Sequence, residues 1–148
     1  RNSGGAGRFR GGCGLVREYK FLGEDAILSM RIDSVDNPTW GVAGGLSGRA
    51  GRATVNPGRP DERVLKPLSD GNRLRCGDVL RLETGGGGGY GPPGERPAEQ
   101  VLSDIRDGFI SAEAAREVYG VALRGVELDR EATATLRATL GREDRHVA

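Results

Sequence analysis

The sequence predicts an α+β fold, with a mainly antiparallel β body that carries glycine-rich loops and a C-terminal tail of short helices. Three observations lead to this class. Apolar and polar residues alternate in the first half of the chain, apolar residues recur at helical spacing only after Gly94, and 26 of the 148 residues are glycine. Because aromatic residues make up only 5 % of the chain, the core is expected to be small. We expect a body at 1–94 and a helical tail at 95–148.

The strands of the body are predicted from alternation between turn residues. Residues 15–22 and 26–33 alternate apolar with polar side chains, and Gly23-Glu24-Asp25 between them predicts a turn. We expect these two strands to pair as an antiparallel hairpin. Further strands are expected at 78–84 and, in an otherwise irregular stretch, at 53–55. Turns are expected at 70–72 and 76–77.

Start and stop signals define three helices in the tail. Pro97 opens the first and Gly108 ends it. Ser111 caps the second, which Gly120 ends, and Asp129 caps the third, which Gly141 follows. A short strand is expected at 121–123. Three groups of residues are expected to form the apolar faces of the helices: Val101, Leu102 and Ile105; Ala115, Val118 and Tyr119; and Ala132, Leu136 and Leu140.

Composition excludes several classes of protein. The net charge of +1 provides no basic field for nucleic acid, and no apolar run is long enough to span a membrane. Cys13 and Cys76 are too few for a disulfide scaffold, so we expect ordinary core thiols in a reducing cytoplasm. His146 is the only histidine, which rules out a Ser/His/Asp triad or a multi-histidine metal site within this chain.

The glycine run at 85–91 contains G-x-G-x-x-G spacing after a predicted strand, as in dinucleotide-binding turns. Its context argues against that function, because Pro92-Pro93 follows where a helix should begin, and no Lys-Ser or Lys-Thr follows as in a P-loop. We interpret the run as a strand-to-helix loop whose backbone passes close to a neighbouring strand or a ligand.

Other candidate site residues have simpler alternatives. The glycine- and arginine-rich segment at 3–12 is interpreted as a structured loop rather than an RNA-binding tract. Within it, Arg8 or Arg10 could bind a carboxylate or a phosphate; the alternative is that the arginine faces solvent. The side chain of Trp40 is expected to fill the core beneath its loop rather than to contact a ligand. The carboxylates on the helices are interpreted as solvated or capping charges: Asp104, Asp107, Glu113 and Glu117.

Several motifs, in order, resemble the C-terminal part of the hydantoinase B/oxoprolinase family, and the resemblance covers nearly the whole chain. They are Ser3-Gly4-Gly5-Ala6-Gly7-Arg8-Phe9-Arg10-Gly11-Gly12, Pro38-Thr39-Trp40-Gly41 with Gly44-Gly45, Gly77-Asp78-Val79-Leu80-Arg81, the run 85–91, and the segment from Asp104 to Val121. The family includes β subunits of ATP-dependent N-methylhydantoinases, the corresponding half of 5-oxoprolinases and one subunit of acetone carboxylases. Since members are much longer and this chain starts at Arg1 without an initiator methionine, we expect it to be the C-terminal piece of a longer subunit.

The resemblance implies hydrolysis of cyclic amides, such as hydantoins or 5-oxoproline. ATP, with magnesium, would act at an ATPase-like partner subunit of the hydantoinase A type. A metal is possible in the part upstream of Arg1, and no cofactor or metal is expected on this chain. No catalytic residue is assigned. The residues expected to line the floor or rim of a substrate site are Arg8, Arg10, Trp40, Gly86, Gly88 and Tyr90.

Two function classes remain open for these residues. In the first, they form part of an enzyme. This enzyme is either a hydrolase of cyclic amide C–N bonds, inactive when only this chain is present, or a carboxylase of the same family. The other class is a non-catalytic scaffold or subunit-interface module. Because the small core offers little apolar area against backbone entropy, we expect an oligomer, or a chain that needs its upstream part and partner subunit. The stripe of Val101, Leu102 and Ile105 is expected at that contact.

Overall fold

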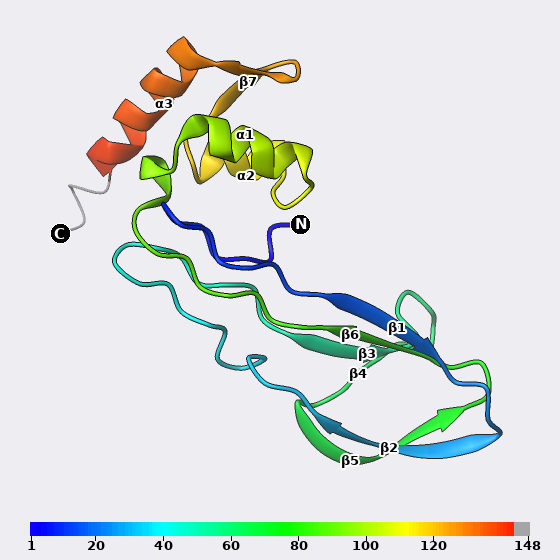
Figure 1. The fold of residues 1–148 in the computed structure, drawn as a ribbon. Helices are drawn as coiled ribbons and strands as arrows, with labels where there is room; N and C mark the ends of the chain where they lie inside the picture. Colours follow the sequence, from blue (N-terminus) through cyan, green and yellow to red (C-terminus); the bar gives the residue numbers. More distant parts are fainter. Residues whose placement is uncertain (144–148) are drawn as a thin grey trace.

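Two sheets lie at one end of the molecule, and the helices lie at the other together with a small hairpin; extended glycine-rich segments connect the two ends (Figure 1). The computed structural model describes residues 1–143. Its strand pairs are all antiparallel, and its helices follow the β body along the chain. The predicted α+β class is therefore confirmed.

The larger sheet has four strands in the order β1-β6-β3-β4. The strands are β1 (Val16–Lys20), β3 (Arg52–Val55), β4 (Arg63–Val64) and β6 (Val79–Glu83). Alternation places Leu80 and Leu82 of β6 on one face, opposite Val55 and Ala53 of β3. This face is the inner, apolar side of the sheet.

The second sheet consists of β2 (Asp25–Arg31) and β5 (Leu68–Arg75) and lies against the first. The predicted hairpin between 15–22 and 26–33 is wrong, because β1 pairs with β6 and β2 pairs with β5. The chain leaves the larger sheet after β1 so that Met30 can cover its apolar face from a second layer. The turn predicted at 70–72 is also wrong, since β5 runs through it; Gly71 has φ +72° beside the point where the pairing register shifts.

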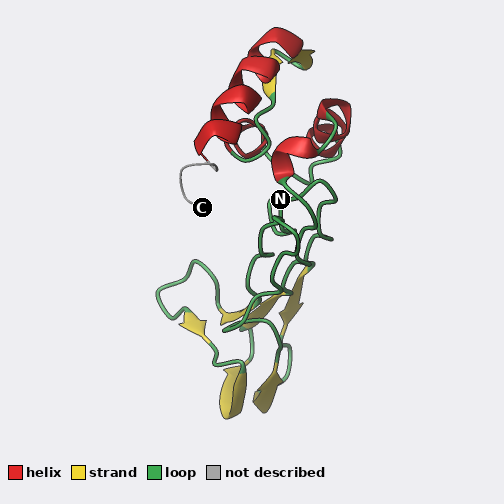
Figure 2. Cartoon of the chain, turned by 90° about the vertical axis from the view of Figure 1, so that its left-hand side faces the viewer, coloured by secondary structure: helices red, strands yellow, loops and turns green. Residues whose placement is uncertain are grey.

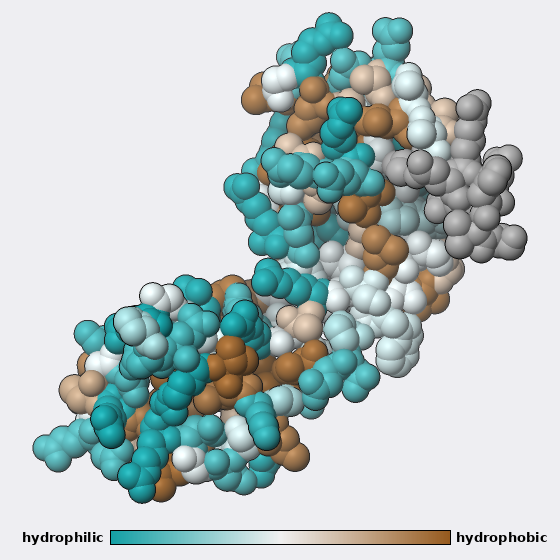
Figure 3. Space-filling view, turned by 180° about the vertical axis from the view of Figure 1, so that it is seen from behind, coloured by the Kyte–Doolittle hydropathy of each residue, from teal (hydrophilic) through white to brown (hydrophobic). Residues whose placement is uncertain are grey.

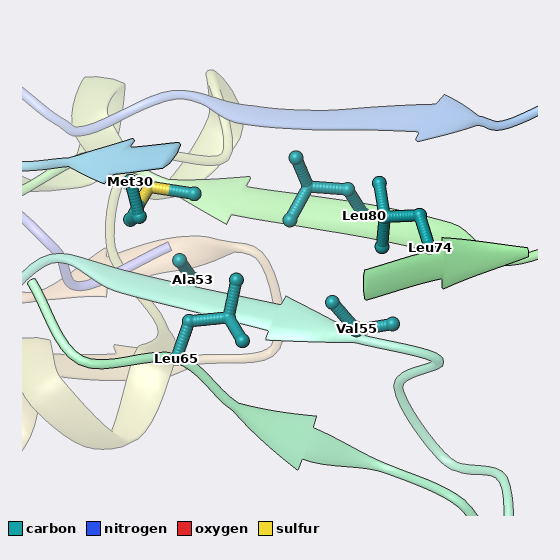
Figure 4. Packing of buried hydrophobic residues seen from close by; sticks show 6 residues of the cluster. All are labelled: Met30, Ala53, Val55, Leu65, Leu74 and Leu80. Atoms are coloured by element: carbon teal, nitrogen blue, oxygen red, sulfur yellow. The ribbon is translucent and has the colours of Figure 1, made fainter. Parts of the chain in front are cut away.

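The core of the β end lies between these two sheets (Figure 4). Six residues form it, each at most 8 % exposed: Met30, Ala53, Val55, Leu65, Leu74 and Leu80. Phe21, Leu28, Ile32 and Leu82 pack at its edge. Neither cysteine belongs to it: Cys76 is exposed and Cys13 is partly exposed, so the expectation of core thiols is wrong.

The helical end contains a short 3-10 turn and three α-helices with a small hairpin between the last two. They are η1 (Pro93–Glu95), α1 (Ala98–Arg106), α2 (Ala112–Glu117), β7 (Ala122–Arg124), β8 (Glu127–Asp129) and α3 (Arg130–Glu143). Both predicted caps are confirmed. The Ser111 side chain accepts a hydrogen bond from Ala114 N–H, and the Asp129 carboxylate accepts one from Ala132 N–H. The sequence does not predict strand β8, because the segment is too short to show alternation.

Helix α3 departs from its prediction at both its end and its buried face. It continues past Gly141, and among its side chains up to residue 139 the most buried is Thr133, whose Oγ1 accepts a hydrogen bond from Ala122 N–H at 3.0 Å. The side chain of Leu140 lies outside the described residues. A hydroxyl that satisfies a backbone donor of β7 therefore anchors the helix, rather than an apolar stripe alone.

A second apolar cluster holds the helical end together. Its buried members are Val101, Ile110, Ala115, Tyr119 and Val121. Val101 is 0 % exposed and Ile105 packs against the cluster, so the stripe predicted at a partner contact instead lies largely inside the chain's own core. The two ends that contain these clusters appear as separate lobes in Figure 3, and nearly white residues of neutral hydropathy lie between them. Since Ala6 packs on the helical cluster, the division at residue 94 stays a prediction.

None of the helices in residues 1–143 is both long and apolar enough to cross a membrane.

Candidate functional site

Three extended segments run side by side between the two ends of the molecule (Figure 2). We call them the glycine bundle: residues 3–14, 39–51 and 84–91. Backbone hydrogen bonds connect each segment to the other two. Gly5 N–H donates to Gly87 C=O at 2.8 Å, Leu46 N–H donates to Ala6 C=O at 2.7 Å, and Gly89 N–H donates to Leu46 C=O at 2.9 Å.

Glycine is required in the bundle because the backbones approach too closely for side chains. A Cβ atom built on Gly48 would lie 2.2 Å from the Gly86 carbonyl oxygen, and one built on Gly89 would lie 2.1 Å from that of Ala6. Glycines at 45, 48 and 51 recur every third residue, the repeat of an extended helix with three residues per turn. The predictions of a structured segment at 3–12 and of a close-approach loop at 85–91 are both confirmed, and the neighbour of that loop is other backbone.

Aromatic and apolar side chains gather where the bundle meets the helical end. Phe9 and Val42 both bridge to Tyr90, and the Phe9 and Tyr90 rings are 6.3 Å apart between centroids. These side chains are at least half exposed. Arg8 completes the group: its guanidinium carbon lies 5.7 Å from the centre of the Phe9 ring, and its Nη1 lies 3.8 Å from the Glu95 carboxylate. We call Arg8, Phe9, Val42 and Tyr90 the aromatic rim.

Arg10 belongs to a different environment. Its side chain is only 14 % exposed, with Nε 3.4 Å from Asp104 Oδ2, and its guanidinium lies 4.7 Å from the centre of the Phe109 ring. Arg96 approaches the same carboxylate oxygen at 2.9 Å. Two guanidinium groups thus share one carboxylate, which attaches the bundle to α1.

The predicted site residues are therefore brought together only in part. Arg8 and Tyr90 meet at the aromatic rim. Trp40 and Gly88 meet through the main chain, because a Cβ on Gly88 would lie 1.9 Å from the Trp40 carbonyl oxygen. The Trp40 side chain is 75 % exposed, so the prediction that it fills the core beneath its loop is wrong. Arg10 is turned toward the helices, and Gly86 packs against the main chain of Ser3.

Sequence reasoning missed the part that Asp104 plays. The sequence predicts a solvated charge there, but Asp104 is 6 % exposed and paired with arginines. One signal in the sequence does indicate that Asp104 faces inward. It lies three residues after Val101 and one before Ile105, on the inward face of α1. Its partner Arg96 also donates to the Arg8 carbonyl at 3.1 Å, which connects the rim to the same network.

Tyr119 brings a buried hydroxyl close to this network. Its side chain is 1 % exposed, and within the described part of the chain its hydroxyl has no hydrogen-bond partner. Burial raises the pKa of Tyr119 above its usual value, so the phenol stays neutral at physiological pH. A cavity of about 170 Å³ beside Tyr119 is lined by small residues such as Ala6 and Ser47 and by larger apolar ones such as Leu46 and Ile110. It is too small for most ligand sites.

Within residues 1–143, no three His, Cys, Asp or Glu side chains lie close enough together to hold a metal ion. The described residues therefore provide no three-ligand metal site of this kind. No chemical step through a metal or through ATP-bound magnesium is assigned to them.

Comparisons with known proteins agree with this geometry. The family model for hydantoinase B/oxoprolinase matches residues 1–93. A putative D-/L-hydantoinase subunit from Pseudomonas sp. strain NS671 is 38 % identical over 138 residues, covering 92 % of this chain and 23 % of the relative. The acetone carboxylase alpha subunit of Xanthobacter autotrophicus is 25 % identical over 182 residues, covering 97 % of this chain and 23 % of the relative.

The fold is also found in a solved structure. The crystal structure of the ATP-dependent caprolactamase from Pseudomonas jessenii superimposes with a TM-score of 0.74 at 30 % identity, over 93 % of this chain and 24 % of that one. This chain spans less than a quarter of the length of these relatives. Because the family model covers more than half of the chain, including both sheets of the β end and the whole glycine bundle, the protein belongs to the hydantoinase B/oxoprolinase family.

Proposed function

We propose that the protein takes part in the ATP-dependent opening of a cyclic amide, in which a ring C–N bond is hydrolysed. The observation that carries the proposal is the match to the ATP-dependent caprolactamase, which extends over both lobes and the bundle between them. The relative named as a D-/L-hydantoinase subunit supports the same substrate class. The substrate would be a hydantoin, 5-oxoproline or a related lactam.

In this proposal, ATP binds with magnesium to a partner subunit of the hydantoinase A type, and residues upstream of Arg1 supply any metal site. The glycine bundle serves as a rigid support in this proposal. Close backbone contacts leave no space for a side chain at positions such as Gly48 and Gly89, and the Asp104 carboxylate holds the bundle against α1 through Arg10 and Arg96. A rigid frame of this kind fixes the position of whatever residues it carries.

The aromatic rim is the part of this frame that we propose to lie at the edge of the substrate site, together with the exposed ring of Trp40. An apolar surface with one guanidinium suits a planar amide ring, which presents apolar faces and carbonyl oxygens that accept hydrogen bonds. Arg8 is only loosely held, at 3.8 Å from Glu95, so it remains available to a carbonyl oxygen.

Carboxylation is the second candidate, because the chain is also similar to an acetone carboxylase alpha subunit. One experiment separates the two. The full-length subunit that contains these residues is produced with a hydantoinase A-type partner, and ADP formation is measured with hydantoin, 5-oxoproline or caprolactam, and separately with acetone plus bicarbonate. We expect ADP release and ring-opened product with a cyclic amide. ADP formation only with acetone and bicarbonate would instead assign the protein to the carboxylases.

The proposed role of the Trp40 ring is tested in the same assay with Trp40→Ala. Since this ring is 75 % exposed, the substitution should leave the melting temperature unchanged while raising KM about tenfold through loss of an apolar contact. Val126→Ala is the control, because Val126 is similarly exposed, at 79 %, in the β7–β8 turn. Equal kinetics for the two variants would remove Trp40 from the site.

A further inference from the structure

The outer edge of β1 has backbone groups that no other strand uses within residues 1–143. Thr84 N–H donates to Leu15 C=O at 2.9 Å, and Phe21 N–H donates to Asp78 C=O at 2.8 Å. Backbone groups of an antiparallel strand point alternately to its two sides, so odd-numbered residues of β1 face β6. The N–H and C=O groups of Val16, Glu18 and Lys20 therefore face the open edge.

The edge of β1 lacks two of the features that usually prevent strand addition, although it does carry three charged side chains: Arg17, Glu18 and Lys20. It contains no proline and no bulge, and its pairing with β6 is continuous over all five residues. All five side chains of β1 are exposed, and the apolar ones nearby are prominent: Val16 is 60 % exposed, Tyr19 50 % and Leu22 77 %. Its charged residues must then either repel an incoming strand or select one.

The charge pattern selects a second copy of the same strand in one register. When two copies pair antiparallel about a two-fold axis at Tyr19, Glu18 of each lies opposite Lys20 of the other, and Val16 lies opposite Leu22. An axis at Arg17, Glu18 or Lys20 would instead place two identical charges opposite each other, which destabilises a pair. The Tyr19 register also pairs the open backbone groups of Glu18 with those of Lys20.

We propose that a second copy of this protein adds to the open edge of β1 in this register, doubling the four-stranded sheet into one continuous sheet. Glu18 already accepts hydrogen bonds from Arg81 within its own sheet, with Arg81 Nη2 at 2.6 Å. Lys20 of the second copy would extend this into a row of alternating positive and negative charges. The contact is short, so the dimer forms reversibly, as small interfaces do.

Sedimentation over a range of concentrations tests the pairing. We expect a monomer–dimer equilibrium that Lys20→Glu weakens about tenfold, because both Glu18–Lys20 pairs become repulsive. Lys66→Glu is the matched control, since it makes the same change in net charge at an exposed site outside β1. A monomer at every concentration, or equal weakening by both variants, would overturn the proposal.

Cross-linking tests the register independently. With Cys13 and Cys76 replaced by serine, Tyr19→Cys places one thiol of each copy on the two-fold axis, at the ~4.5–5.5 Å Cβ separation of directly opposite residues. Oxidation should give a covalent dimer with Tyr19→Cys and none with Val16→Cys, which lies opposite Leu22. A dimer that cross-links equally through both positions has another register, and the proposal then fails.

Discussion

Replacing Gly89 by alanine tests whether close backbone packing holds the glycine bundle together. Gly89 is buried, and its N–H donates to Leu46 C=O at 2.9 Å. A Cβ at this position would lie 2.1 Å from the Ala6 carbonyl oxygen and 2.8 Å from that of Gly5. Ordinary contact begins at 3.4 Å, so the Ala6 carbonyl must move by roughly 1 Å. It cannot do so without losing the hydrogen bond that it accepts from Leu46 N–H.

The expected loss follows from these contacts. Overpacking in a closely packed interior costs about 1–3 kcal/mol, and a buried backbone group left without its hydrogen bond costs about 1–3 kcal/mol more. We therefore expect Gly89→Ala to lower the free energy of unfolding by about 3–5 kcal/mol. That is a large share of the ~5–15 kcal/mol of a typical domain. Urea denaturation followed by circular dichroism measures the change.

Gly12→Ala is the matched control in the same bundle. Gly12 is exposed, and a Cβ there meets no atom within 4 Å. The substitution should leave stability within about 0.5 kcal/mol, or raise it slightly by reducing the entropy of the unfolded chain. If Gly89→Ala and Gly12→Ala unfold at the same denaturant concentration, the bundle is loose and the packing argument fails.

Three further predictions concern charge and activity. Asp104→Ala should lower the free energy of unfolding by about 3–5 kcal/mol, because it leaves two largely buried guanidinium groups without their carboxylate. The control Asp107→Ala, on the exposed side of the helix, should change it by at most ~0.5 kcal/mol. Equal denaturation midpoints for the two variants would contradict this prediction. Asp78 accepts hydrogen bonds from Arg75 N–H and the Asn56 amide, which lower the pKa of its carboxyl below the usual 3.8. The stabilisation by the ionised carboxylate is therefore complete at neutral pH and is lost as the pH falls below about 4. Asp78→Asn should lower the free energy of unfolding at pH 7 by about 1–3 kcal/mol. If the difference in stability between the variant and the unmodified chain stayed the same at acid pH, the ionised carboxylate would not be its origin. The isolated chain should show no ATP-dependent opening of hydantoin or 5-oxoproline, and turnover by the purified chain above the buffer rate would show that these residues hold a complete site.

The sequence by itself determined the elements whose signals are local. Alternation located β2 and β6, and proline, serine and aspartate located the starts of the three α-helices, because each signal lies within one turn of the element that it defines. The ordered glycine motifs identified the family, whose model matches residues 1–93. The requirement for close approach at 85–91 was likewise predictable, because only glycine permits it.

Only the tertiary structure decided which elements meet. Strand β1 pairs with β6 and not with its neighbour β2, because burial of Met30 against the larger sheet outweighs the short connection between β1 and β2. Asp104 carries no local mark of burial, since the arginines that neutralise it come from distant segments of the chain. The exposure of Trp40 was equally hidden, because packing of the bundle's main chains leaves no interior space for its ring. Contacts between distant segments depend on how whole layers pack, and a local pattern does not contain that information.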